Sequence, residues 1–229
     1  MKMRLNKFLA ECGVASRRAA DAMIAAGKVA VGGRRAALGE MVDAHISVVT
    51  VNGRRIRRQT DVDQLTLVLN KPAGIITTMS DEHGRKTVAQ FLPHHRRLFP
   101  VGRLDADTTG VLLCTTDGAL ARILTHPSSG VAKRYDVIAR GNMSAPTIAA
   151  LGAIEHVRLP DGSHRFAVIL REGKNRQVRR MCAQAGLRVL SLTRTRFGPV
   201  RLGKLKTGST RTLSDAEVRE LNRLRAEHA

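Results

Sequence analysis

Tryptophan is absent from this chain of 229 residues, and other aromatic side chains are scarce, with one tyrosine and five phenylalanines. The three cysteines, Cys12, Cys114 and Cys182, are odd in number and far apart. Their spacing argues against a disulfide framework or a Cys-x-x-Cys metal site and indicates a reducing compartment. The sequence also lacks a secretory apolar region and any run of about 18 apolar residues. We therefore expect a cytoplasmic protein with no membrane segment.

Acidic residues are few compared with basic ones. The chain has 19 Asp and Glu against 39 Lys and Arg, a formal net charge of +20, and the basic residues are spread over its whole length. Such an excess favours a polyanionic partner, most simply nucleic acid, although a merely cationic protein stays an alternative. With 43% hydrophobic residues, the chain can bury a core as one large domain or two unequal ones.

The first sixty residues have the pattern of a small basic domain. Apolar residues at helical spacing predict a helix from Leu5 to Gly13, and a second helix that Ser16 caps and Gly27 ends. Alternating segments and the Asn52-Gly53 dipeptide then predict strands joined by a tight turn. We expect a first domain at residues 1–60, a polar linker at residues 57–63, and a second domain at residues 61–229.

The segment RLNKFLAECGVASRRAADAMIAAGKVAVGG, which begins at Arg4, resembles the small RNA-binding domain named after ribosomal small-subunit protein four. The resemblance implies two helices and a hairpin that present a basic face to structured RNA. It makes Arg17 and Arg18, at the start of the second helix, candidates for RNA binding. Without the resemblance, an ordinary solvated helix face is the alternative interpretation of the two arginines.

The second region alternates predicted strands with short helices. Strands are expected at residues 65–70 and 111–116, an extended segment at 75–78, and a short helix at 87–92. A basic helix is expected to start between Gly173 and Asn175 and to end at Gly186. This alternation indicates an α+β domain.

A single carboxylate and an arginine stand on a tight loop within the stretch VGRLDADTTGVLLCTTDG, residues 101–118. The loop carries Arg103 and Asp105 and leads directly into a buried strand, which is where a rigid scaffold can present a reactive group. Asp105 and Asp107 could alternatively bind a divalent metal ion, but the sequence nearby offers no further carboxylates. His94 and His95 also lack a third ligand and are typical of an exposed basic loop.

Two further motifs supply candidate partners for that carboxylate. Tyr135, the only tyrosine, lies in the segment KRYDV between cations and could stack on a base, or could equally be a core residue. The segment REGKNRQVRRM gathers Arg176, Arg179 and Arg180 at the start of the basic helix. Their guanidinium groups suit a carboxylate or phosphates, unless the helix merely exposes them to solvent.

Together, LNKPAGIITT, GRLDADTTGVLLCTTDG, KRYDV, EGKNRQVRRM and RTRFGPVRLGKLKTGSTRTL resemble, in this order, the bacterial ribosomal-RNA pseudouridine synthases that carry the N-terminal RNA-binding domain described above. The resemblance implies a mixed, largely antiparallel sheet with flanking helices and a central cleft. It also implies conversion of a specific uridine to pseudouridine with no cofactor and no metal. Because a base inside a helix cannot be reached, its extrusion must be offset by backbone contacts and stacking.

The resemblance also implies roles for individual residues. Asp105 matches the catalytic aspartate, which attacks the uridine or assists departure of the base from its ribose. Tyr135 matches the aromatic residue that stacks on the target uracil and is a candidate for proton transfer, and Arg179 matches the basic partner of the aspartate. Both are expected to be catalytic together with Asp105. Further RNA contacts are expected from residues of the same motifs: Lys71, Arg103, Arg176 and Arg180.

The sequence thus predicts an enzyme that isomerises uridine in ribosomal RNA. The large subunit is favoured over the small one, because Cys182 and the segment RTRFGPV look nearer to that branch. A non-catalytic RNA-binding or ribosome-assembly factor, and a synthase acting on transfer RNA, are the alternatives. The expected partner is ribosomal RNA or a ribosome-assembly intermediate, bound by a monomer.

Overall fold

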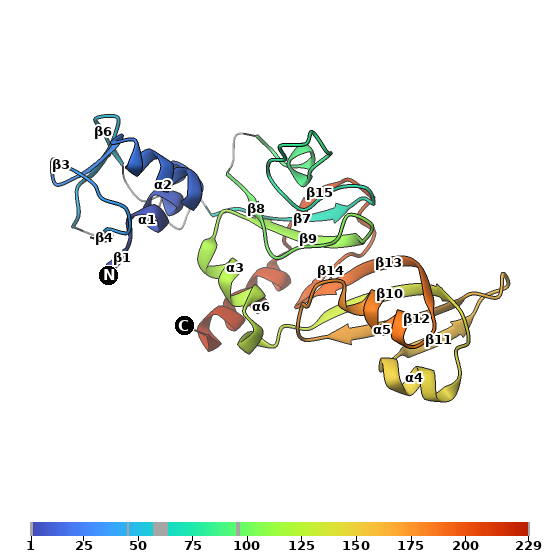
Figure 1. Cartoon of the computed structure of the whole chain (residues 1–229). Helices are drawn as coiled ribbons and strands as arrows, with labels where there is room; N and C mark the ends of the chain where they lie inside the picture. Colours follow the sequence, from blue (N-terminus) through green and yellow to red (C-terminus); the bar gives the residue numbers. More distant parts are fainter. Residues whose placement is uncertain (1, 45, 57–63, 95–96, 229) are drawn as a thin grey trace. The chain divides into compact units, whose positions relative to one another are not determined.

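The computed structural model describes residues 2–44, 46–56, 64–94 and 97–228 (Figure 1). The chain divides into two compact units, Met1–Gln64 and Leu65–Ala229. The linker expected at residues 57–63, and with it the boundary between residues 60 and 61, lies outside the described residues, as does His95. None of the described helices combines the length and apolar character that a membrane crossing requires.

The first unit combines two helices with short antiparallel strands. Its elements are β1 (Lys2–Arg4), α1 (Leu5–Glu11), α2 (Arg17–Ala25), β2 (Val29–Val31), β3 (Arg34–Arg35), β4 (Met41–Asp43), β5 (Val49–Val51) and β6 (Arg54–Ile56). Strand β1 pairs with β4, and the other strands form a sheet in the order β3-β2-β5-β6.

Local chemistry explains how these elements begin and turn. The Ser16 hydroxyl accepts a hydrogen bond from the Ala19 amide at 3.1 Å, which caps α2 as predicted. Asn52 and Gly53 have φ angles of 48° and 77°, as a tight turn between β5 and β6 requires. Leu5, Leu9 and other apolar residues of both helices are buried in one core with strand residues. The predicted helices and the strand turn are confirmed.

The second unit is built on one mixed sheet. Its elements are β7 (Thr66–Lys71), η2 (Val88–Phe91), β8 (Phe99–Pro100), β9 (Thr109–Thr115), α3 (Gly118–Thr125), η3 (Pro127–Ser129), β10 (Lys133–Arg140), α4 (Ala145–Leu151), β11 (Ile154–Arg158), β12 (His164–Leu170), α5 (Gln177–Gln184), β13 (Arg188–Phe197), β14 (Val200–Arg201), β15 (Thr210–Thr212) and α6 (Asp215–Glu227). The strand order is β11-β12-β10-β13-β9-β7-β15, with β14 beside β13 and β8 beside β9.

Two local predictions differ from the structure. Residues 75–78 form no strand, and Ile76 makes only an isolated bridge with Thr87. Helix α5 begins at Gln177, later than expected, because Arg176 has a left-handed φ of 48° and therefore stands outside the helix. The consequence is a sharp corner that directs Arg176 and the first turn of α5 toward the loop before β9.

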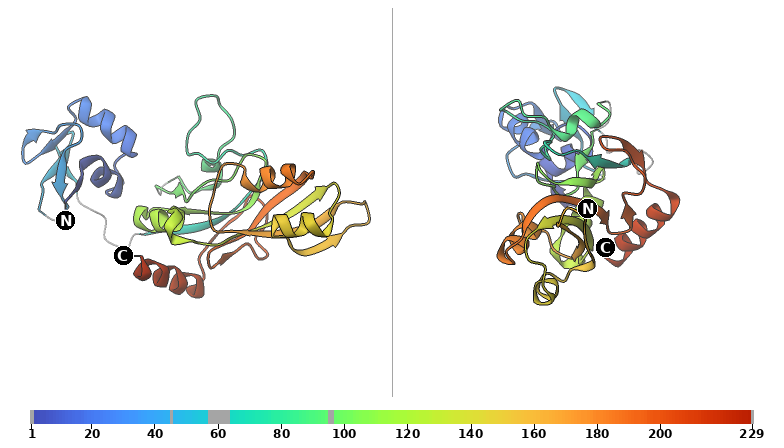
Figure 2. Two further views of the ribbon diagram at one scale, coloured as in Figure 1. Left: turned by 60° about the horizontal axis from the view of Figure 1, so that its bottom comes forward. Right: turned by 90° about the vertical axis from the view of Figure 1, so that its right-hand side faces the viewer.

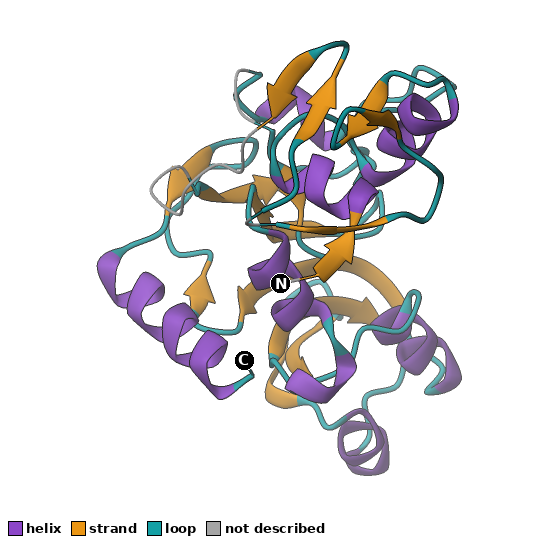
Figure 3. Cartoon of the chain, turned by 90° about the vertical axis from the view of Figure 1, so that its left-hand side faces the viewer, coloured by secondary structure: helices purple, strands orange, loops and turns teal. Residues whose placement is uncertain are grey.

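Helices cover the sheet in two groups. Helices α3 and α6 lie side by side (Figure 2) and bury Leu120, Leu124 and Leu221 against Val111 and neighbouring residues of the sheet. Helices α4 and α5 instead pack on β10, β12 and β13. Both units therefore mix helices with strands (Figure 3), which confirms the α+β class and the mixed, largely antiparallel sheet. The central cleft stays a prediction.

The two halves of this sheet meet at a short seam. Strands β9 and β13 run parallel and pair through Thr109 with Thr193 and Gly110 with Arg194. Gly110 has a φ of 100°, and a Cβ atom there would lie 2.2 Å from the carbonyl oxygen of Arg194. Only glycine permits this conformation and this approach of two backbones. The seam therefore depends on the absence of a side chain at Gly110.

One buried lysine ties down the loop that precedes β9. The side chain of Lys71 is fully buried, and its ammonium group donates hydrogen bonds to the carbonyl oxygens of Pro72 at 2.9 Å, Ala106 at 3.3 Å and Thr108 at 2.9 Å. The prediction that Lys71 contacts RNA is wrong, because every donor faces the protein's own backbone. Burial lowers the pKa of Lys71 to about 8, against the opposing charges of Asp107 and Asp105.

Replacement of Gly110 by alanine is expected to destabilise the second unit by about 3 kcal/mol or more, because the new Cβ meets backbone that cannot move aside. Gly118→Ala is the matched control, since Gly118 starts α3 and a Cβ there has open space. Urea unfolding of both variants measures the difference. Equal midpoints for the two variants would contradict this account of the seam.

Lys71 is also expected to make stability depend on pH. Its pKa is about 8 in the folded protein and 10.5 ordinarily, so the unfolded chain binds more protons between these values. The free energy of unfolding should therefore rise with pH across this window, by up to about 3 kcal/mol from this group. The advantage of the wild type over Lys71→Met should grow from pH 8 to 10.5, measured by urea unfolding. Lys204→Met, which removes an exposed lysine, should show no such growth.

Candidate active site

The loop between β8 and β9 holds Asp105 between two buried anchors. On one side Leu104 is buried, and its carbonyl oxygen accepts a hydrogen bond from the Thr77 hydroxyl at 2.6 Å. On the other side the Thr108 amide donates to the Asp105 carbonyl at 3.1 Å, which closes a turn. The carboxylate of Asp105 itself stays 31% exposed. The loop thus has a fixed backbone and an accessible carboxylate, as expected for a presented reactive group.

The arginines at the start of α5 reach this loop from a distant part of the sequence. The guanidinium of Arg176 forms a fork with the carboxylate of Asp107, with two hydrogen bonds of 3.3 Å. Arg179 donates to the backbone carbonyl of Asp107 at 2.9 Å and lies 3.3 Å from its carboxylate. Arg176 also lies 4.0 Å from the carboxylate of Asp105.

Asp107, and not Asp105, is therefore the main anchor for the arginines. Sequence reasoning assigned Arg179 to Asp105 and considered Asp107 only for a metal site or as loop structure. The structure differs because Arg176 and Arg179 lie about one helical turn apart, so both can reach one carboxylate. Burial raises the pKa of Asp107, but the hydrogen bonds from Arg176 and the charge of Arg179 outweigh it, and the pKa stays below its ordinary value.

This arrangement leaves polar atoms without partners. Among the described residues, Nε of Arg179 and the hydroxyl of Thr108 are buried and have no hydrogen-bond partner. A buried polar atom without a partner is unfavourable by about 1–3 kcal/mol. The arginines are thus paired with Asp107 in a geometry that does not satisfy all of their donors.

Tyr135 lies in the same row of the sheet as the seam. In the strand register it pairs with Arg194, which pairs with Gly110, which pairs with Lys71. Its half-buried ring packs against the apolar cluster under α5 and also against the cluster that contains Leu104. The structure therefore brings Tyr135 next to the apolar base of the Asp105 loop, although the two are thirty residues apart.

Arg194 is a site residue that sequence reasoning missed. Its guanidinium is buried, with Nε donating to the Val111 carbonyl at 2.8 Å and its carbon 4.8 Å from the centre of the Phe197 ring. It thereby links β13 to β9 at the seam. Two arginines alternate in the segment RTRF, and nothing in that pattern distinguishes the buried Arg194 from the exposed Arg196.

The other predicted RNA contacts are exposed. In the second unit, Arg103 is exposed on the Asp105 loop and Arg180 is exposed on α5. In the first unit, Arg17 and Arg18 are exposed on α2. Exposure is compatible with phosphate binding, and their roles stay predictions. Among the described residues, no group of three or more His, Cys, Asp and Glu side chains could hold a metal ion. At Asp107 a cation would also have to displace Arg176 and Arg179.

Comparisons with known proteins match each of the two units to a family model. A family model described as RNA pseudouridylate synthase matches residues 65–184, and an S4 domain model matches residues 3–45. An uncharacterized RNA pseudouridine synthase of Mycobacterium tuberculosis is 41% identical over 239 residues, which cover 96% of this chain and 92% of that protein.

Two further relatives add a named activity and a solved fold. The ribosomal large subunit pseudouridine synthase B of Pseudomonas aeruginosa is 40% identical over 236 residues, covering 94% of this chain and 60% of the relative. A crystal structure of a pseudouridylate synthase superimposes with a TM-score of 0.64 at 26% identity, covering 96% of this chain and 99% of that one. Because an S4 domain is followed by a second unit that matches the synthase model, the chain belongs to the family of RNA pseudouridine synthases.

Proposed function

We propose that this RNA pseudouridine synthase isomerises a uridine of ribosomal RNA, with the large subunit as its target. Relatives named ribosomal large subunit pseudouridine synthase B, from Pseudomonas aeruginosa and Vibrio cholerae, are 40% and 38% identical to it. The net charge of +20 and the S4 domain favour a large, structured RNA. The substrate is free ribosomal RNA or an assembly intermediate, and a cytoplasmic monomer acts on it.

A relative of different specificity supports a second candidate target. The dual-specificity RNA pseudouridine synthase of Salmonella typhi is 36% identical over 230 residues. A second RNA substrate is therefore the alternative to a single ribosomal site. Mapping pseudouridines in ribosomal and transfer RNA, with and without the gene, decides between them. A site lost only from transfer RNA would overturn the ribosomal proposal.

Asp105 is the catalytic carboxylate in this proposal. The reaction breaks the N1–C1′ bond of uridine and forms a C5–C1′ bond, with the proton lost at C5 balanced by one gained at N1. It is redox neutral and requires one group that acts on the base or its ribose. The accessible Asp105 carboxylate, on a backbone fixed by Lys71 and Thr77, is the observation that carries this assignment.

Tyr135 and Arg103 hold the target nucleotide, and Tyr135 also takes part in proton transfer. The half-buried ring of Tyr135, at the apolar base of the loop, offers a stacking surface for an extruded uracil. The exposed Arg103, two residues before Asp105, is suited to a phosphate or to the displaced strand. Arg176, Arg179 and Arg180 supply further phosphate contacts beside the carboxylate.

Asp107 positions the arginines for this reaction. Asp107 holds both arginines on the loop and keeps the guanidinium of Arg176 4.0 Å from the Asp105 carboxylate, too far for a close ion pair. An RNA phosphate that arrives at the site competes with Asp107 for the same donors. The unpaired Nε of Arg179 is available to such a rearrangement.

Asp105→Asn is expected to lower pseudouridine formation at least about 1,000-fold, because the amide can neither attack nor accept a proton as the carboxylate does. Binding of ribosomal RNA should change little, since no phosphate contact is removed. Mapping of pseudouridine in ribosomal RNA from a deletion strain complemented with each variant measures the effect. Asp161→Asn, the same change on an exposed turn, is the control. Activity of Asp105→Asn near that of the control would refute the assignment.

Asp107→Asn is expected to strengthen RNA binding while it lowers the turnover number kcat. It releases the charge of Arg176 and Arg179, so RNA should bind a few-fold more tightly and with a steeper salt dependence. The value of kcat should fall about tenfold, because the arginines are no longer held beside Asp105. Fluorescence binding titrations and single-turnover kinetics measure the two effects. Weaker binding with unchanged kcat would contradict the positioning role of Asp107.

A further inference from the structure

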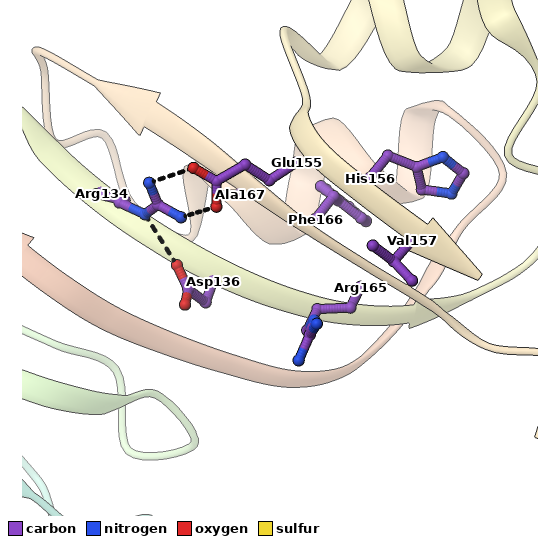
Figure 4. A pocket seen from close by; sticks show the side chains of 8 residues that line it. All are labelled: Arg134, Asp136, Glu155, His156, Val157, Arg165, Phe166 and Ala167. Carbon is purple, nitrogen blue, oxygen red and sulfur yellow. Dashed lines mark hydrogen bonds and ion pairs between the residues drawn. The ribbon is translucent and has the colours of Figure 1, made fainter. Parts of the chain in front are cut away.

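Two adjoining hollows lie on β10, away from the candidate active site. The first, of about 290 Å³, is lined by residues of β10, β11 and β12, among them Arg134, Asp136, Glu155 and Arg165 (Figure 4). The second, of about 400 Å³, shares Arg134 and Asp136 with the first and continues over β13 and β14. Together they form one concave surface across five strands, which we call the β10 surface.

Strand alternation places the β10 surface opposite to Tyr135. Side chains along a strand point alternately to its two sides, so Arg134 and Asp136 point away from the side that carries Tyr135 and Val137. Tyr135 and Val137 pack in the cluster under α4 and α5, and α5 is the helix that reaches the Asp105 loop. The β10 surface is therefore distinct from the proposed catalytic centre.

Both acidic residues of the β10 surface are paired with one arginine at its centre. In Figure 4 the guanidinium of Arg134 lies between two carboxylates. It donates two hydrogen bonds to Glu155, one of them at 2.9 Å, and a third from Nε to Asp136 at 3.2 Å. Asp136 also accepts a hydrogen bond from the Thr195 hydroxyl at 3.0 Å. These contacts fix the floor of the surface and neutralise Arg134.

The backbone of β11 is distorted at the point where it supplies Glu155. Glu155 has a left-handed φ of 55°, and the register of β11 against β12 shifts between Ile154 and Val157. A bulge of this kind redirects a side chain, here toward Arg134. The hydrogen bonds from Arg134 lower the pKa of Glu155, and the charge of Arg165 adds to the effect.

Three more arginines line the β10 surface, and their charges are not balanced by a paired carboxylate among the described residues. Arg165, Arg196 and Arg201 are exposed, and within the described part of the chain none of them takes part in an ion pair. Among the described residues, the guanidinium of Arg196 donates only to the carbonyl oxygen of Gly198, at 2.7 Å. The surface thus combines four arginines with two carboxylates that are already occupied. Its excess positive charge is presented by planar groups whose forked donors match phosphate oxygens.

We propose that the β10 surface is a second RNA-binding site, at which Arg165, Arg196 and Arg201 bind phosphates of the RNA backbone. Phosphates complement the excess positive charge, and the enzyme already acts on RNA. Of the two rings among the lining residues, Phe166 is buried and His156 is stacked on and hydrogen-bonded to His164, so neither is free to stack on a base and the contacts are to the RNA backbone. RNA segments outside the target nucleotide therefore bind here, and only substrates long enough to reach both sites use it.

The triple variant Arg165→Gln/Arg196→Gln/Arg201→Gln tests the proposal through the salt dependence of binding. The probe is fluorescent polyuridylate, titrated with the full-length enzyme at several salt concentrations. Loss of three phosphate contacts should reduce the slope of log Kd against log salt by about 2, at about 0.7 per contact on single strands. Activity on a short RNA hairpin that reaches only the catalytic site should stay unchanged, which separates this result from a failure of the proposed catalytic function.

The control removes the same charge elsewhere in the same unit. Arg122→Gln/Arg219→Gln/Arg223→Gln replaces exposed arginines of α3 and α6. Equal slopes for the two triple variants would overturn the proposal, because the effect would then follow total charge only. A midpoint of thermal unfolding equal to that of the wild type shows that each variant is folded.

Photo-crosslinking of the wild-type enzyme to RNA containing 4-thiouridine supplies evidence that needs no variant. Crosslinked peptides from β12 or from the β13–β14 turn are the expected result. Their absence, together with saturable binding of polyglutamate to the same arginines, would overturn the RNA assignment in favour of an acidic protein segment.

Discussion

The ammonium group of Lys71 is the interaction on which the candidate active site depends. It stands at the end of β7, fully buried, and donates to the carbonyl oxygens of Ala106 and Thr108, which follow Asp105 in the loop, and to that of Pro72. A buried charge is tolerated only when it is paired or hydrogen-bonded, and here the partners are the loop's own backbone. The loop and the lysine therefore stabilise each other: the carbonyl oxygens solvate the buried ammonium group, and the ammonium group holds those carbonyls in position.

Around this contact, the sheet brings together residues from distant parts of the chain. The seam between β9 and β13 puts Arg194 beside Gly110, and Gly110 pairs with Lys71 in turn. Tyr135 joins the same row through Arg194. The close backbone approach at Gly110 thus determines how near the Tyr135 ring and the loop can come. The geometry around Asp105 therefore depends on close packing of β9 against β13, which is possible only because Gly110 has no Cβ atom.

Much of this architecture could be predicted from local sequence signals, and some of it could not. The caps of the helices, the Asn52-Gly53 turn and the buried strand after Asp105 follow from short-range chemistry, so they were predictable. The partner of Arg179 and the burial of Lys71 depend on how strands far apart in sequence align. A lysine before a proline has the same local signature whether its charge faces RNA or three carbonyl groups. Long-range register, which no local pattern encodes, decides between these outcomes.

The pairing of Asp107 with two arginines has a consequence for selectivity. A carboxylate attached to the same protein acts as a competitor at high effective concentration, always present beside the guanidinium groups. An anion that contacts only these arginines has to displace the Asp107 carboxylate without forming any other favourable contact with the protein. An RNA held by further contacts elsewhere loses little by doing so. In the proposed function, the aspartate thereby sets a threshold of affinity that other polyanions have to exceed before they occupy the candidate active site.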